Sequence, residues 1–226
     1  MFYWDSTFLL LIPALLLTLY AQQKVKSTYI KYSRIKSRRG ISGAEVASYL
    51  LRKNGLGDIP IEESVGRLSD HYDPVKRVLR LSSENFRGSS LAALGVAAHE
   101  VGHAVQHGTG YMPLNIRNSV LPAAKFGSTL AWPLFIGGFF FSIPYLLDLG
   151  IILFTAAVLF QVVTLPVEFN ASGRAIESLK SAGFLEEDEI SKARKVLNAA
   201  ALTYVAAAAV AVLQLIRLIL LRGGRD

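Results

Sequence analysis

The sequence contains no cysteine, which excludes disulfide bonds, thiolate metal ligands and cysteine nucleophiles. It also has no internal repeat, no glycine-rich phosphate-binding loop and no low-complexity tract. Acidic residues are absent between Gln22 and Gly40, although lysine and arginine are frequent there. The informative features are therefore the apolar runs, the basic stretch and the few histidines.

Apolar residues make up 52% of the 226 residues and give a positive mean hydropathy of +0.38, well above a typical soluble protein. The excess lies in four runs, at 1–21, 120–141, 146–165 and 199–221. Since about 20 apolar residues cross a bilayer, we expect four transmembrane helices. The middle two would form a hairpin that turns at 142–145, and a buried hairpin of a soluble protein is the alternative. The first run lacks a basic start and a cleavage site, which predicts a retained anchor.

The basic residues predict the orientation in the membrane. They gather directly after the first apolar run, as Lys24, Lys26, Lys31, Arg34, Lys36, Arg38 and Arg39. Because cytoplasmic flanks are rich in lysine and arginine, we expect segments 22–119 and 166–198 to face the cytoplasm. The C-terminal tail would lie outside, although its two arginines mildly oppose this rule. The net charge of +7 also has a nucleic-acid interpretation, but a lipid bilayer is the simpler partner and we expect no nucleic acid.

A histidine motif lies late in an apolar segment that opens near Ser90. If this segment is a helix, His99 and His103 stand one turn apart on one face, with Glu100 beside them. This H-E-x-x-H arrangement is typical of zinc hydrolases, so it predicts one Zn²⁺ held by both imidazoles and Glu100 as general base. Ordinary helix histidines are the alternative. The surrounding helix is apolar nearly all round, however, and a buried His-Glu-His cluster is costly without a compensating ion.

A third metal ligand is expected from the polar segment that opens at Pro166. Glu168 follows directly on a predicted span, on the same side of the membrane as His99, so it is placed to complete the site. An ordinary interfacial glutamate is the alternative. The competing ligand is His107, which lies ~12 Å along a continuous helix from His99. Only a helix break, for which Gly108 is a candidate, would bring it to the same ion.

Shorter patterns predict the rest of the region between the first two spans. Residues 42–45 are typical of a capping box and predict a helix that ends at 54–55. Two short runs, 65–72 and 76–82, flank Asp73-Pro74 and predict a hairpin. Its edge is either available to an extended peptide substrate or purely structural.

Three stretches together resemble a known family. His99-Glu-Val-Gly-His-Ala-Val-Gln106 and, two spans later, Pro166-Val-Glu-Phe-Asn-Ala-Ser172 are similar to the YugP-type neutral zinc metallopeptidases of bacterial membranes. Asp70-His-Tyr-Asp-Pro74 resembles that family's segment before the metal helix, and the likeness runs over nearly the whole chain. It implies a peptidase of the bacterial cell membrane with peptide or protein substrates. His71 has no assigned role, and turn chemistry accounts for Asp73.

A more distant likeness, to the HtpX and CAAX prenyl protease group, concerns the third ligand. In that group a glutamate of a later Glu-x-x-Ala-Asp segment is the third zinc ligand, which implies Glu168 here. Ser172 stands where the group has aspartate, and a hydroxyl is a weaker partner for a ligating histidine. A basic residue after this ligand helps to bind the transition state in that group, and Arg174 is the candidate in this chain.

These patterns predict a mostly α-helical membrane zinc metallopeptidase of gluzincin type, with a small zincin-like α+β core on the cytoplasmic side. The expected division is an anchor at 1–21, the H-E-x-x-H region at 22–119, a hairpin at 120–165, the third-ligand segment at 166–198, and a last helix with its tail at 199–226. Two other functions stay open: an inactive zinc-binding scaffold, and a metal-dependent hydrolase of a non-peptide membrane substrate. Neither the substrate nor the oligomeric state is predicted.

Overall fold

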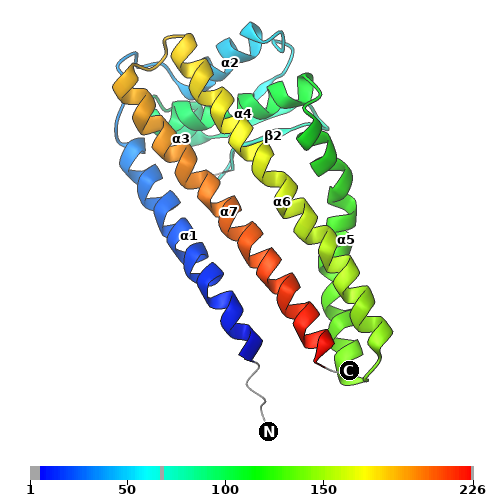
Figure 1. Ribbon diagram of the computed structural model, residues 1–226. Coiled ribbons are helices and arrows are strands. Elements are labelled where there is room, and N and C mark those ends of the chain that lie inside the picture. The colour runs from blue at the N-terminus through cyan, green and yellow to red at the C-terminus, as the bar shows by residue number, and fades with distance from the viewer. Residues whose placement is uncertain (1–5, 67–68, 225–226) are drawn as a thin grey trace. The chain divides into compact units, whose positions relative to one another are not determined.

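The computed structural model describes residues 6–66 and 69–224, which form long helices and one small sheet (Figure 1). In chain order the elements are η1 (Ser6–Leu11), α1 (Ile12–Ser33), α2 (Gly43–Lys53), β1 (Ile61–Ser64), β2 (His71–Asp73), β3 (Val78–Ser82), α3 (Ser83–Phe86), α4 (Leu91–Gly108), α5 (Met112–Phe140), α6 (Pro144–Ser181) and α7 (Glu187–Gly223). The predicted mostly helical fold with a small α+β part is confirmed. The start of the predicted anchor (1–5), part of a predicted strand (67–68) and the end of the tail (225–226) lie outside the described residues.

Three helices in the described ranges are long and apolar enough to cross a membrane, namely Ser6–Ser33, Pro144–Ser181 and Glu187–Gly223. They contain three of the four predicted spans. The remaining predicted span lies in α5, which is one continuous helix of 29 residues. This helix carries Lys125 and two internal prolines, and it is not among the three candidate spans found in the described ranges. The fourth span therefore stays a prediction.

Internal contacts divide the chain into two units. One comprises Met1–Ala21, Asn115–Leu165 and Thr203–Asp226, and the other comprises Gln22–Leu114 and Pro166–Leu202. The second unit contains α2, α3, α4 and the sheet, together with every residue proposed above as catalytic or metal-binding. The candidate site is therefore built within a single unit.

Helix α2 and the predicted hairpin both form in the second unit. Ser42 caps α2, and both hydrogen bonds of the capping box with Glu45 are present. The sheet has the order β1-β3-β2, with β1 parallel and β2 antiparallel to β3. In the turn between β2 and β3, Asp73 Oδ1 accepts hydrogen bonds from the amides of Val75 and Lys76. Turn chemistry thus accounts for Asp73, as expected.

The prediction of the strands was wrong in two respects. The first strand of the hairpin covers His71–Asp73 only, instead of beginning at residue 65. The parallel strand β1 was not predicted at all. Its sequence, Ile61 followed by two glutamates and a serine, lacks the apolar-polar alternation by which a strand is recognised. Pairing with β3, which is distant from it in the sequence, is what makes this segment extended.

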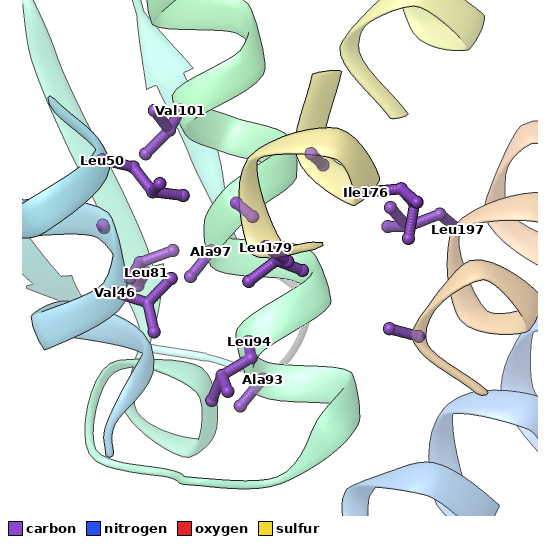
Figure 2. Packing of buried hydrophobic residues seen from close by; sticks show 14 of the residues in the cluster. Val46, Leu50, Leu81, Ala93, Leu94, Ala97, Val101, Ile176, Leu179 and Leu197 are labelled. Atoms are coloured by element: carbon purple, nitrogen blue, oxygen red, sulfur yellow. The ribbon is translucent and has the colours of Figure 1, made fainter. Parts of the chain in front are cut away.

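The core of the second unit surrounds α4. Figure 2 shows Val46 and Leu50 of α2 beside Ala97 and Val101 of α4, with Leu179 of α6 close to them. All of these side chains are at most 2% exposed. Helix α4 is therefore covered on most sides, as its nearly continuous apolar sequence predicts. Its two motif histidines keep side-chain exposures of 15% and 14%, so they lie at the open edge of this core.

Candidate metal centre

Helix α4 presents both motif histidines on one face. Ser90 caps its N-terminus by accepting a hydrogen bond from the amide of Ala93, and the helix continues without interruption to Gly108. This confirms the predicted helix. His99 and His103 stand one turn apart with their Nε2 atoms separated by 3.2 Å. The two nitrogens therefore border the same small space.

Glu168 reaches this space from α6. Its Oε2 lies 3.4 Å from His99 Nε2 and 3.6 Å from His103 Nε2, and the three possible ligand atoms all lie within 4.8 Å of one another. Glu168 is only 3% exposed, and its Oε2 has no hydrogen-bond partner among residues 6–66 and 69–224. A buried carboxylate oxygen without a hydrogen bond is costly unless a cation compensates it. The structure thus brings the three predicted ligands together around a place suited to a cation.

The reach of Glu168 depends on Gly102, inside the H-E-x-x-H motif. A Cβ at this position would lie 2.7 Å from the carbonyl oxygen of Ala171 and 3.1 Å from its Cα. Both distances are below ordinary non-bonded contacts, so a side chain at 102 would push the backbone of α6 away. Ala171 lies one turn beyond Glu168 on that helix. The close crossing of α4 and α6 at Gly102 therefore determines how near Glu168 comes to the histidines.

Each histidine has a polar partner at its other ring nitrogen. Ser172 Oγ lies 3.1 Å from His99 Nδ1, and Gln106 Oε1 lies 3.0 Å from His103 Nδ1. With Nδ1 engaged, Nε2 of each ring is the atom that faces Glu168. Zinc-ligating histidines are held by the protein in the same way. Ser172 thus contacts a predicted ligand from the position where the wider protease group has aspartate.

The carboxylates of Glu100 and Glu168 favour positive charge on His103. Burial lowers the pKa of His103, but the nearby carboxylates of Glu168 and Glu100 favour its charged form and outweigh burial, so the pKa is raised. Glu100, whose charge favours the protonated form of His103, is itself buried, with 8% of its surface exposed. Surroundings that favour the positive form of an imidazole also favour a metal cation, which would take the place of that proton.

The donor set fits zinc better than the hard divalent cations. It combines two imidazole nitrogens with one carboxylate, as in catalytic zinc centres that keep a fourth position for water or substrate. Magnesium and calcium prefer all-oxygen sites. His99, His103 and Glu168 are therefore suited to hold one zinc ion.

The other histidines lie apart from this cluster. His107 Nδ1 is 2.9 Å from the hydroxyl of Tyr72, and α4 continues through His107 without the break that would turn it toward the ligands. His71 Nδ1 lies 2.8 Å from the backbone oxygen of Ser69 and is exposed. Neither residue belongs to the group of three that can share an ion.

Sequence reasoning missed two residues behind His103. Gln106 is completely buried, and its Nε2 donates to the carbonyl oxygen of Val167 at 2.8 Å and to Asn170 Oδ1 at 3.0 Å. The same Asn170 oxygen accepts a hydrogen bond from Nε of Arg174, the predicted transition-state residue, at 2.8 Å. Gln106 stands three residues after His103, and this helical spacing is the signal that pairs the two side chains.

Comparison with known proteins identifies the family. Residues 7–223 match a family described as "Putative neutral zinc metallopeptidase". Over 218 residues the chain is 50% identical to the "Putative membrane protease YugP" of Bacillus subtilis (strain 168), and this match covers 96% of the chain and 97% of the relative. No solved structure gives a significant match. As the resemblance predicted, the chain belongs to this family of neutral zinc metallopeptidases.

Proposed function

We propose that this chain is a membrane peptidase that hydrolyses peptide bonds, with one zinc ion held by His99, His103 and Glu168. The observation that carries the proposal is the convergence of the three ligand atoms, one of them a buried carboxylate oxygen without a hydrogen bond. Zinc in such a site supplies a Lewis acid and lowers the pKa of a water molecule. Two histidines and a glutamate are the ligands of gluzincin peptidases, which is the subclass we propose.

Glu100 is the proposed general base. It directly follows His99 on α4, and its charge acts on His103, so its carboxylate belongs to the electrostatic surroundings of the ligands. In the proposed reaction this carboxylate takes a proton from the attacking water and then gives it to the leaving amine nitrogen. Arg174 stays the candidate for binding the charge that develops on the substrate oxygen, and its guanidinium has N–H groups in addition to the one that Asn170 accepts.

We further propose that α5 is the fourth span and that the site faces the cytoplasm. At 1.5 Å per residue, the 29 residues of α5 exceed the ~30 Å thickness of the hydrocarbon core. Four spans return segments 22–119 and 166–198 to one side, and the basic cluster at 24–39 favours the cytoplasmic side. The relative is named a membrane protease. We therefore propose the bacterial cell membrane as the location and membrane or membrane-associated proteins as substrates.

Replacement of Glu100 by glutamine tests the mechanism. Full-length protein purified in detergent should contain about one zinc per chain in both forms, because Glu100 is not a proposed ligand. Cleavage of unstructured peptides should fall at least about a hundredfold in Glu100→Gln, as is typical when a general base is removed. The matched control Glu187→Gln changes a glutamate whose side chain is 79% exposed on α7, and it should retain full cleavage.

The same variant identifies substrates in cells. Membrane proteins that accumulate with Glu100→Gln, relative to the wild type, are candidate substrates of the peptidase. Zinc in a wild-type protein that cleaves nothing would favour an inactive zinc-binding scaffold. Undiminished peptide cleavage by Glu100→Gln would refute the role of this residue.

A further inference from the structure

A chain of hydrogen bonds behind His103 joins α6 to α4, and the proposed reaction does not use it. Arg174 Nε donates to Asn170 Oδ1 at 2.8 Å, and Gln106 Nε2 donates to the same oxygen at 3.0 Å. Gln106 Oε1 in turn lies 3.0 Å from His103 Nδ1. Since Gln106 is completely buried, water does not compete for these contacts.

The side-chain amides of Gln106 and Asn170 each have only one orientation that satisfies these hydrogen bonds. Gln106 Nε2 also donates to the carbonyl oxygen of Val167 at 2.8 Å. That oxygen can only accept, so a flipped Gln106 would set two oxygens against each other. Arg174 Nε can only donate, so Asn170 must present its oxygen. Gln106 therefore turns its own oxygen toward His103, and His103 Nδ1 must carry the hydrogen.

We infer that Gln106 is a positioning residue that fixes His103 in the tautomer with hydrogen on Nδ1, and that Asn170 holds Gln106 in place. This tautomer keeps the lone pair on Nε2, the ring atom that faces His99 and Glu168. The inference rests on the proposed zinc site, because the tautomer matters only if Nε2 binds a metal. The hydrogen of His103 is then already on Nδ1, and Nε2 is free to bind the ion.

His99 has no comparable constraint. Its Nδ1 lies 3.1 Å from Ser172 Oγ, and a hydroxyl group either donates or accepts a hydrogen bond. Both tautomers of His99 are therefore compatible with this contact. The two proposed histidine ligands therefore differ. Gln106 presets His103, whereas the Ser172 hydroxyl leaves the tautomer of His99 open, to be set by the Nε2 lone pair of His103 that it faces at 3.2 Å or by an ion.

Nitrogen-15 NMR of metal-free, histidine-labelled full-length protein tests this directly. The chain has four histidines, and single substitutions assign their signals. At a pH where the ring is neutral, His103 should show hydrogen on Nδ1 alone in the wild type and a mixture of tautomers in Gln106→Met, which removes the acceptor at similar volume. Asn170→Asp keeps an acceptor for both neighbours and should preserve the wild-type signal. If Gln106→Met does not fold, Asn170→Leu removes the residue that holds Gln106 in place. The fraction of the other His103 tautomer should then rise less than in Gln106→Met.

Zinc affinity, measured by competition with a chelator, gives a second readout. Gln106→Met should bind zinc about 10–100-fold more weakly than the wild type, as is usual when the partner of a ligand is lost. The matched control is Asn85→Leu. Asn85 is another buried amide of the same unit, 1% exposed, and its side chain hydrogen-bonds with Asp70 Oδ2 and the Tyr29 hydroxyl instead of with the residues around His103. This control should lower stability without changing the His103 signal or the zinc affinity.

The outcomes separate this inference from the proposed function. An unchanged His103 tautomer in folded Gln106→Met would overturn the inference, even if the protein is an active zinc peptidase. An equal effect of Asn85→Leu on the tautomer would also overturn it, because general loosening would then be the cause. A wild type that shows the predicted tautomer but binds no zinc would refute the proposed function and leave the positioning by Gln106 supported.

Discussion

Replacing Gly102 by alanine tests whether the helix crossing builds the metal site. The new Cβ would lie 2.7 Å from the oxygen of Ala171, whereas non-bonded atoms rest at about 3.5 Å. To relieve this contact, α6 has to retreat by several tenths of an ångström, and Glu168 retreats with it. Metal-ligand distances tolerate only about 0.2 Å, so we expect zinc affinity to fall at least about tenfold. Overpacking costs about 1–3 kcal/mol, partly offset by about 1 kcal/mol of better helix propensity.

Gly173 is the matched control for this prediction. It lies on α6 between Ser172 and Arg174, but a Cβ there meets no atom within 4 Å in the part of the chain that the structure describes. Gly173→Ala should therefore bind zinc like the wild type and be as stable or up to about 1 kcal/mol more stable. The assays are chelator competition at fixed pH and thermal unfolding of the metal-free proteins. Wild-type zinc affinity in Gly102→Ala would show that the close crossing does not set the position of Glu168.

Glu168→Ala should lose zinc and cleavage, whereas His107→Ala should keep both, and metal analysis of folded protein showing the opposite would overturn the ligand assignment. A reporter fused after Asn54 should report cytoplasm, and one in the turn between α5 and α6 (141–143) should report the outside; two equal reports would disprove the span count. Hydrogen bonds from the amides of Lys76 and Val75 lower the pKa of Asp73, so its contribution to stability is present above the ordinary aspartate value, near 3.9, and is lost as pH falls through the lower folded value. The difference in melting temperature between wild type and Asp73→Ala should accordingly be full at pH 6 and shrink below about pH 3.9; a constant difference would show that the carboxylate charge is not involved.

Helix α4 was predictable because the residues that specify it are neighbours in the sequence. A serine cap, an apolar run and two histidines four residues apart specify both the helix and the face on which the imidazoles stand. The proximity of Glu168 is not local and was inferred from the predicted spans and from the family resemblance. Its distances of 3.4 and 3.6 Å to the imidazoles depend on the register between α4 and α6, which no single segment encodes.

The parts that sequence reasoning missed share a physical cause. Gly102, Gln106 and Asn170 act through residues of another helix, with Ala171 opposite the first and Val167 beside the second. A glycine or an amide in a helix has many possible roles, and only the crossing partner selects one. Strand β1 was missed for the same reason, because its extended form depends on pairing with β3.

The missing hydrogen bond of Glu168 Oε2 has a consequence for the stability of the whole unit. If the unpaired oxygen and the two facing imidazole nitrogens are satisfied by an ion that the unfolded chain binds poorly, ion binding and folding are thermodynamically linked. The folded state then gains about 2.7 kcal/mol when free zinc is a hundred times its dissociation constant, and about 4.1 kcal/mol at a thousand times. Supply of the ion would thus govern how long each molecule survives, as well as whether it can act. Cells short of zinc should contain less of this protein at unchanged synthesis.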